Sequence, residues 1–282
     1  MAFSAELETK RALLEGKLRG YGRTLVAYSG GVDSAFLAWC AYQVLGGEML
    51  AVIADSASLA RSQFDDALAF AREQGIPVEI IHTAEMDRPE YLRNDGARCF
   101  HCKDELFTVM ESLRAARGFR TIAYGVNLDD QGDFRPGQKA AAEHQVAAPL
   151  LEGGWTKQEI RELAREAGLR IWNKPASACL SSRIEYGRVV TREALSVVEQ
   201  GEDALRALGF RQVRVRHHGE IVRIEIAKEE LPRALDAAMA AELARIFKDL
   251  GFKFVTLDLE GFRSGSMNAL LPVGELGRGS VR

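Results

Sequence analysis

The chain reads Ser29-Gly30-Gly31-Val32-Asp33-Ser34 directly after an apolar run, 24–28, and directly before an apolar stretch with helical character, 35–40. The six residues therefore form the turn from a buried strand into a helix. Adjacent glycines let the backbone approach a ligand closely, and the helix that follows directs unpaired N–H groups and the positive end of its dipole at the turn. The sequence predicts an anion-binding loop here.

The side chains of this loop favour a phosphate ligand. No lysine follows the glycines, so the loop is not the GxxxxGK[ST] type, which carries its own lysine to the phosphates. The hydroxyls of Ser29 and Ser34 can donate to a phosphate, and Asp33 can hold Mg²⁺ or orient the loop. The simpler alternative is a strand–glycine–helix turn that serves packing alone.

Composition indicates a globular protein long enough for two domains or one large one. Of the 282 residues, 47% are apolar, and the net charge of −3 argues against a nucleic-acid partner. The first ten residues lack the apolar core of a signal peptide, and no run is long enough to cross a membrane. We expect a cytoplasmic protein with no membrane partner.

Strands alternate with helices through the first two thirds of the chain. We expect helices at 5–20, 58–74, 104–117 and from 156, with strands at 24–29, 49–55, 78–82, 121–126 and, as a candidate fifth, 145–151. This order predicts an α/β fold, a parallel sheet of about five strands with helices on both faces. Ligands of such sheets bind beyond the carboxyl ends of the strands. We expect the segments that follow strands or connect elements to face one cleft there: 29–34, 55–56, 124–130 and 177–183.

The pattern changes after Gly187. A helix at 192–208 leads into short strands at 212–216 and 221–226, and a last strand is expected at 254–258. This is the pattern of a compact α+β unit. We therefore predict two domains, 1–186 and a small C-terminal domain, 187–282.

Three cysteines outside the predicted core are candidate metal ligands. Cys99 and Cys102 form a CxxC pair, and Cys179 follows later, whereas Cys40 lies among apolar residues and is expected in the core. Three thiolates without a clear fourth fit an iron–sulfur cluster with one iron left open. A zinc site completed by His101, or ordinary buried thiols, are the alternatives.

Two further groups of residues point to chemistry. Pro175 keeps the segment around Cys179 out of a helix, and the nearby Arg183 is a cation that would lower the pKa of the thiol. On the expected strand, Arg214 and Arg216 point to the same face, where paired guanidinium groups suit a phosphate. A solvated basic surface is the alternative for the two arginines.

Four strings occur together in this chain: the loop 29–34, Arg-Cys-Phe-His-Cys-Lys at 98–103, Cys-Leu-Ser-Ser-Arg-Ile-Glu-Tyr-Gly at 179–187 and Leu-Asp-Leu-Glu-Gly-Phe-Arg-Ser-Gly-Ser-Met-Asn at 257–268. The first resembles the signature of the PP-loop ATP pyrophosphatases, which cleave ATP between the α- and β-phosphates. All four together resemble the LarE family, ATP-dependent sulfur transferases that make the nickel-pincer cofactor of lactate racemase. The resemblance covers nearly the whole chain.

The resemblance implies a reaction and a set of residues. Such an enzyme adenylates a carboxylate of pyridinium-3,5-biscarboxylic acid mononucleotide, a small-molecule substrate, with ATP and Mg²⁺, releases pyrophosphate, and replaces AMP by sulfur. Homo-oligomers are implied as well. The expected roles are ATP and pyrophosphate binding for Ser29, Gly30, Gly31, Val32, Asp33, Ser34 and Asp55, phosphate binding for Arg214 and Arg216, and catalysis for Cys179, Asp33, Arg183 and Glu202.

The three cysteines also bear on the source of the sulfur. One branch of the family donates the sulfur of a single cysteine and leaves dehydroalanine. Cys99, Cys102 and Cys179 together resemble the branch that carries a 4Fe-4S cluster, which we favour. Sacrifice of Cys179 stays open.

Three other functions compete with this one. A PP-loop enzyme that thiolates tRNA would share the cysteines, but the acidic net charge argues against it. An amidating synthetase would leave the cysteines unexplained. A nucleotide-binding protein that senses redox state through a cluster would bind ATP or AMP without releasing pyrophosphate.

Overall fold

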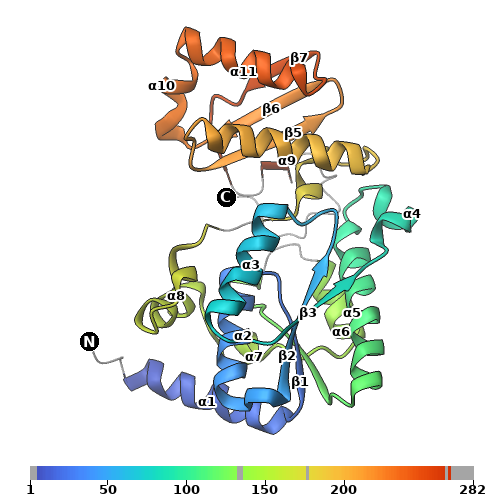
Figure 1. The fold of residues 1–282 in the computed structure, drawn as a ribbon, viewed down its shortest axis with the longest axis vertical. Coiled ribbons are helices and arrows are strands. Elements are labelled where there is room, and N and C mark those ends of the chain that lie inside the picture. Colours follow the sequence, from blue (N-terminus) through green and yellow to red (C-terminus); the bar gives the residue numbers. More distant parts are fainter. Residues whose placement is uncertain (1–4, 132–135, 176–177, 264–265, 268–282) are drawn as a thin grey trace. The chain divides into compact units, whose positions relative to one another are not determined.

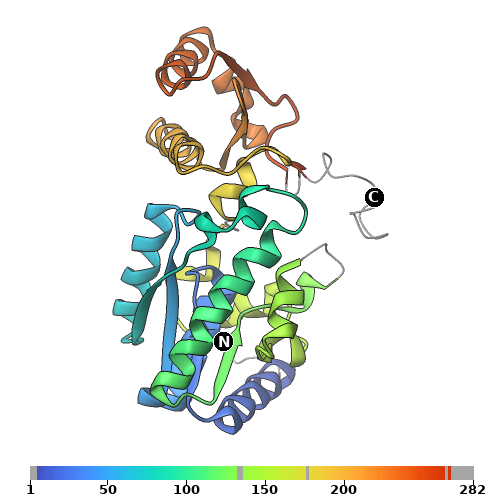
Figure 2. The same cartoon turned by 90° about the vertical axis from the view of Figure 1, so that its right-hand side faces the viewer.

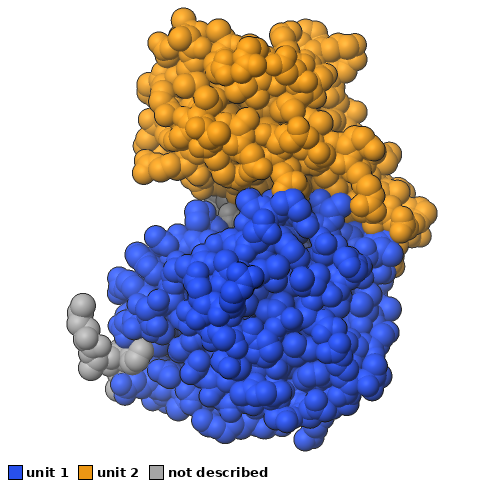
Figure 3. Space-filling view, in the orientation of Figure 1, with its two compact units in different colours: residues 1–85, 99–177, 279–282 blue, residues 86–98, 178–278 orange. Residues whose placement is uncertain are grey.

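The computed structural model describes residues 5–131, 136–175, 178–263 and 266–267. Their contacts group them into two compact units, coloured separately in Figure 3. Unit 1 holds residues 5–85, 99–131 and 136–175, and unit 2 holds 86–98, 178–263 and 266–267. Unit 2 thus includes residues 86–98 and 178–186, which the sequence assigned to the first domain.

Unit 1 is built on a four-stranded parallel sheet. Its strands are β1 (Thr24–Ala27), β2 (Met49–Asp55), β3 (Val78–His82) and β4 (Thr121–Tyr124), in the order β3-β2-β1-β4. Side chains alternate between the faces, so Val26 packs into one apolar core while Leu25 packs into another. Both faces of the sheet are therefore buried at the central strand β1, and the predicted α/β class is confirmed.

Helices cover both faces of this sheet (Figures 1 and 2). On one face, the core that contains Val26 is completed by four helices: α1 (Ala5–Tyr21), α2 (Val32–Leu45), α3 (Arg61–Glu73) and α8 (Lys157–Glu166). On the other face, the core that contains Leu25 is completed by α5 (Arg98–Arg117) and α6 (Pro136–Glu143). The short helices are α4 (Pro89–Leu92), α7 (Pro149–Glu152), η1 (Gly46–Glu48), η2 (Glu85–Asp87), η3 (Leu128–Asp130), η4 (Arg170–Asn173), η5 (Leu180–Arg183) and η6 (Lys228–Glu230).

Two local expectations are corrected. The fifth strand expected at 145–151 is reduced to one bridge between Ala123 and Ala147, because Pro149 stands at the start of helix α7, where its fixed φ suits a helix. The helix expected from residue 104 begins already at Arg98. Cys99 and Cys102 therefore lie one turn apart on α5, on the same side of the helix.

Two glycines allow the loop to sit where it does. Gly30 has φ +70°, and a Cβ there would collide with the Cβ of Ala67 on α3. Gly125 follows β4, and its Cβ would lie 2.7 Å from the backbone nitrogen of Ser34 and 2.9 Å from the carbonyl carbon of Asp33. The residue after β4 thus comes into backbone contact with the first turn of α2, which only glycine permits.

Unit 2 contains a three-stranded sheet and two longer helices. Strands β5 (Val213–His218), β6 (Ile221–Ile226) and β7 (Phe254–Leu257) form a sheet in the order β5-β6-β7. Its apolar side chains pack against α9 (Arg192–Ala207) and α11 (Ala237–Asp249), and the short α10 (Leu231–Ala234) precedes α11. Beyond these elements, 264, 265 and 268 of the C-terminal string lie outside the described residues. The described helices include none with the length and apolar character needed to span a membrane.

Replacing Gly125 by alanine is expected to lower the free energy of unfolding by about 2 kcal/mol, because the new methyl group meets backbone atoms that cannot rotate away. Gly47→Ala is the matched control, since a Cβ at Gly47 has no neighbour within 4 Å. Urea unfolding of both variants measures the difference. Equal stability of the two variants would contradict the close approach of β4 to the loop.

Candidate active site

The loop between β1 and α2 is ordered by its own two serines. The Ser34 hydroxyl accepts from the backbone N–H of Ser29 at 3.2 Å, donates to the carbonyl of Gly31 at 3.1 Å and lies 3.0 Å from the Ser29 hydroxyl. Gly31 stands at the N-cap of α2, with no side-chain capping hydrogen bond. The first turn of a 14-residue helix therefore faces the loop without a capping side chain, which suits an anion.

Two lysines from distant parts of the chain lie beside this loop. The ammonium group of Lys157, the first residue of α8, forms an ion pair with Asp33. That of Lys174, just after η4, donates to the carbonyl of Gly30 at 2.9 Å and pairs with Asp66 of α3. Sequence reasoning missed both lysines. The Thr156–Glu159 capping box predicted where α8 starts, but not that this helix start lies beside the loop at 29–34.

Asp33 itself is left with an open oxygen. Its Oδ2 faces Lys157, while its Oδ1 is buried and has no hydrogen-bond partner among the described residues. A buried carboxylate oxygen without a donor is suited to a cation, and carboxylate oxygens are the ligands that Mg²⁺ takes in proteins. The loop thus fits Mg²⁺ at the position where the sequence suggested it.

The next strand ends in a different kind of polar cluster. Asp55, the last residue of β2, pairs with Arg61 at 2.6 Å on the surface. The hydroxyl of Ser56 donates to Glu85, which is 1% exposed and has its second oxygen, Oε2, buried without a hydrogen-bond partner among the described residues. Asp55 therefore lies at the expected edge of the sheet, and its carboxylate is engaged by an arginine.

In unit 2, Arg183 holds the segment that carries Cys179. Its guanidinium is fully buried and donates to Glu202 Oε1 at 2.8 Å and to the carbonyls of Ala178 and Cys179 at 2.7 and 2.9 Å. Arg206 also pairs with Glu202, at 2.9 Å. Arg183 and Glu202 are thus brought together as a buried ion pair that fixes the backbone at Cys179. Ala176 and Ser177, just before it, lie outside the described residues.

The thiol of Cys179 has a second set of neighbours from residues 86–98. The Ser181 hydroxyl lies 3.7 Å from the thiol sulfur and 2.7 Å from the hydroxyl of the buried Tyr91, and Arg98 donates to the Ser181 carbonyl at 2.9 Å. Burial raises the pKa of Cys179, but Arg98, the Ser181 hydroxyl and then Arg183 lower it, and the result lies below the ordinary value. Sequence reasoning named Arg183 for this effect and missed Arg98, which lowers the pKa of Cys179 more than Arg183 does.

Arg214 and Arg216 lie on one face of the sheet of unit 2. Across the strand pair, Arg214 faces Glu225 and Arg216 faces Arg223. Arg216 is 5% exposed and bonds Glu225 at 2.8 Å, yet its Nε has no hydrogen-bond partner among the described residues. Burial, with the charges of Arg183 and Arg216, lowers the pKa of Arg214 to about 10 although Glu202 opposes the shift. This concentration of buried positive charge favours an anionic ligand.

The three candidate cluster ligands are divided between the units. Cys99 is exposed and Cys102 half-buried on α5 in unit 1, and Cys179 is half-buried in unit 2. Within the described ranges, no three His, Cys, Asp or Glu side chains gather as a metal site. Thiols one helical turn apart remain suitable ligands for a cluster. The cluster itself stays a prediction.

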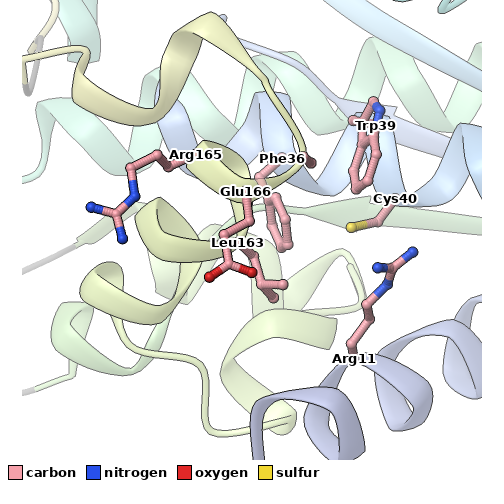
Figure 4. Close-up of a pocket in the computed structure, with 8 residues that line it drawn as sticks. Arg11, Phe36, Trp39, Cys40, Leu163, Arg165 and Glu166 are labelled. Carbon is pink, nitrogen blue, oxygen red and sulfur yellow. The ribbon is translucent and has the colours of Figure 1, made fainter. Parts of the chain in front are cut away.

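A cavity of about 470 Å³ lies elsewhere in unit 1 (Figure 4). Its walls come from α1, α2, α8 and the residue after α8: Arg11, Phe36, Trp39, Cys40, Leu163, Arg165, Glu166 and Ala167. Cys40 belongs to the core, as predicted, and burial raises the pKa of its thiol. None of the predicted site residues lines this cavity.

Known proteins similar to this chain include two that match it over nearly its whole length. It is 42% identical over 265 residues to an uncharacterized protein of Synechocystis sp., covering 94% of this chain and 99% of that protein. It is 36% identical over 273 residues to pyridinium-3,5-bisthiocarboxylic acid mononucleotide synthase of Lactiplantibacillus plantarum, covering 96% and 98%. A third relative, one component of the glutamine-hydrolyzing GMP synthase of Methanococcus vannielii, is 26% identical over only 52% of this chain and 50% of its own length. No family model matches the chain.

Glu202→Gln is expected to lower the stability of the protein by about 3 kcal/mol, because it leaves the buried Arg183 without a charged partner. Arg206→Met is the matched control: it removes the partly exposed cation from the same carboxylate and should cost about 1 kcal/mol or less. Chemical unfolding measures both. A loss of the same size in both variants would show that the Arg183–Glu202 pair does not hold this segment.

Proposed function

The chain belongs to the LarE family, and from this premise we propose that it is an ATP-dependent sulfur transferase that converts the carboxylates of pyridinium-3,5-biscarboxylic acid mononucleotide into thiocarboxylates. It is an enzyme by this relationship. The observation that carries the proposal is the full-length match to the synthase of Lactiplantibacillus plantarum, in a chain whose loop at 29–34 has the geometry of an anion site. The relative of GMP synthase type matches only half of the chain and supports no second function.

The first step activates a carboxylate at the loop. A carboxylate oxygen of the substrate attacks the α-phosphorus of ATP, the bond from that phosphorus to the bridging oxygen of the β-phosphate breaks, and pyrophosphate leaves. The uncapped first turn of α2 would bind the leaving pyrophosphate, and the hydroxyls of Ser29 and Ser34 would donate to it in exchange for their present bonds to each other and to Gly31. Asp33 would hold Mg²⁺ through its open Oδ1, and the ion would neutralise charge that builds up on the phosphates.

The second step replaces the adenylate by sulfur. A sulfur nucleophile adds to the activated carbonyl carbon, and AMP departs with the electron pair of the carbon–oxygen bond. A 4Fe-4S cluster, when bound by Cys99, Cys102 and Cys179, would supply sulfide at the iron without a protein ligand. In the sacrificial route, Cys179 gives up its own sulfur. Either route needs the Cys179 thiol as a thiolate, which its neighbours Arg98, Ser181 and Arg183 favour.

The phosphate of the substrate mononucleotide is assigned to unit 2. Arg214 and Arg216 share a sheet face, and guanidinium groups bind phosphate in a bidentate manner. The unpaired Nε of Arg216, which has no partner among the described residues, supports a ligand at this face. Glu202 acts indirectly in this proposal, by holding Arg183 and through it the backbone of Cys179.

The reaction is tested by anaerobic reconstitution with iron and sulfide, followed by incubation with ATP, Mg²⁺, sulfide and the biscarboxylate mononucleotide. Pyrophosphate, AMP and thiocarboxylate should appear in equal amounts. Asp33→Ala should abolish pyrophosphate release without unfolding the protein, whereas the surface variant Asp249→Ala should release it at the wild-type rate. ATP binding without pyrophosphate release would instead favour a nucleotide-sensing protein.

The source of the sulfur is tested by mass spectrometry of the protein after turnover. With delivery through a cluster, the anaerobic protein should be brown and Cys179 should keep its mass. Loss of one H₂S from Cys179, leaving dehydroalanine, would establish the sacrificial route instead. A colourless protein that holds zinc would exclude the cluster.

A further inference from the structure

The anion loop has no lysine of its own, yet it has two ammonium groups beside it. The ammonium of Lys157 pairs with Asp33, inside the loop, and that of Lys174 reaches the carbonyl of Gly30. The two lysines differ in how they are held. Lys174 is bonded both to a backbone carbonyl and to Asp66, and Asp66 is itself held by Arg170 at the start of the same short segment. Lys174 thus ties the loop to α3.

Lys157 is anchored at its backbone and has a long side chain. Its N–H donates to Asp129 Oδ2 at 2.7 Å, and the capping box of Thr156 and Glu159 fixes the first turn of α8. The Cα is therefore held at the loop, while the four-carbon stem lets the ammonium move among nearby acceptors. Its side chain keeps 33% of its surface exposed, compared with 19% for Lys174.

We propose that Lys157 is the phosphate-binding lysine of this site and that it exchanges Asp33 for a phosphate oxygen when a polyphosphate enters the loop. The inference rests on the proposed function, because it assigns a residue to the pyrophosphate half of ATP. In the absence of phosphate, Lys157 neutralises Asp33 next to the positive end of the α2 dipole. The ligand brings competing negative charge, and a divalent cation that takes Asp33 would leave the ammonium available.

The position of Lys157 also explains how the loop can bind phosphate without a lysine of its own. A Walker-type loop carries its lysine directly after its last glycine, whereas here the corresponding turn is occupied by Val32, Asp33 and Ser34. In this chain the positive charge is supplied by Lys157, the first residue of α8. The loop, the segment after β4 that contains Asp129, and α8 thereby meet at Lys157, whose side chain pairs with Asp33 and whose backbone N–H donates to Asp129.

Binding of inorganic pyrophosphate in the presence of EDTA tests the proposal, because this measurement requires neither the metal nor turnover. Titration calorimetry compares the wild type with Lys157→Met, Asp33→Asn and the double variant that combines both changes. Lys17→Met is the control, since Lys17 forms a comparable ion pair with Glu152 at 2.7 Å on the surface of the same unit. Circular dichroism establishes that each variant is folded.

Lys157→Met should weaken pyrophosphate binding roughly 10- to 100-fold, the effect of losing one charge-assisted hydrogen bond, and Lys17→Met should leave it unchanged. Asp33→Asn should strengthen metal-free binding, because it removes a negative charge and frees the lysine. The double variant shows whether Lys157 contacts the phosphate directly or only neutralises the charge of Asp33. If Lys157 binds phosphate, the double variant binds pyrophosphate about tenfold or more weakly than Asp33→Asn alone, because Asp33 is already neutral in both.

Equal affinity of Asp33→Asn and the double variant would overturn the proposal, because Lys157 would then act only by neutralising Asp33. Wild-type affinity in Lys157→Met would overturn it as well. A wild-type protein that binds neither pyrophosphate nor ATP would instead refute the proposed function. The two failures are therefore distinguishable in one series of titrations.

Discussion

The close approach of Gly125, the residue after β4, to the first turn of α2 is the constraint on which the loop depends. β1 and β4 are parallel neighbours, with Ala27 opposite Tyr124, so both strands deliver their next residues to the same place. There the backbone at Gly125 comes so near to Asp33 and Ser34 that a side chain of any size would collide with it. The loop is thus shaped by backbone packing from outside its own sequence. Its glycines and serines can then orient N–H and hydroxyl groups toward a ligand.

Cations at both candidate sites come from distant parts of the sequence. The loop of unit 1 receives Lys157 and Lys174 from more than a hundred residues downstream. The Cys179 segment of unit 2 receives Arg98 from more than eighty residues upstream. At the loop, the string supplies the geometry of the backbone and residues outside it supply the positive charge. At Cys179, Arg98 from a distant string adds to the charge of Arg183, which lies within the string itself. This division explains why short motifs identify the chemistry of such a site but leave its electrostatics incomplete.

The elements that could be predicted are those whose pattern is local. Strands β2 and β3 have the predicted bounds. β2 is a short, mostly buried apolar run, and β3 is a short β-branched run that begins just after Gly75 and Pro77, so both patterns are local. The start of α8 was readable from its capping box. The fifth strand was wrong because Pro149 favours a helix start, and α5 begins earlier than expected because the CxxC string carries no helix-breaking residue. Lys157 and Arg98 could not be found, since their roles arise from tertiary contacts and charged side chains are usually exposed on the surface.

The placement of residues 86–98 in unit 2 has a consequence for biosynthesis. Tyr91 and Asn94 bond to Ser181 and Ile184, partners that lie 90 residues further along the chain. On the ribosome, where chains emerge from the N-terminus, this segment is made long before the residues that bury it. It must wait while residues 99–175 of unit 1 are synthesised, and closing so long a loop carries an entropic cost that the contacts of the completed unit 2 offset. The polar contacts around Cys179 are therefore among the last parts of the molecule to assemble, although Tyr91, Asn94 and Arg98, which contribute to them, are translated early.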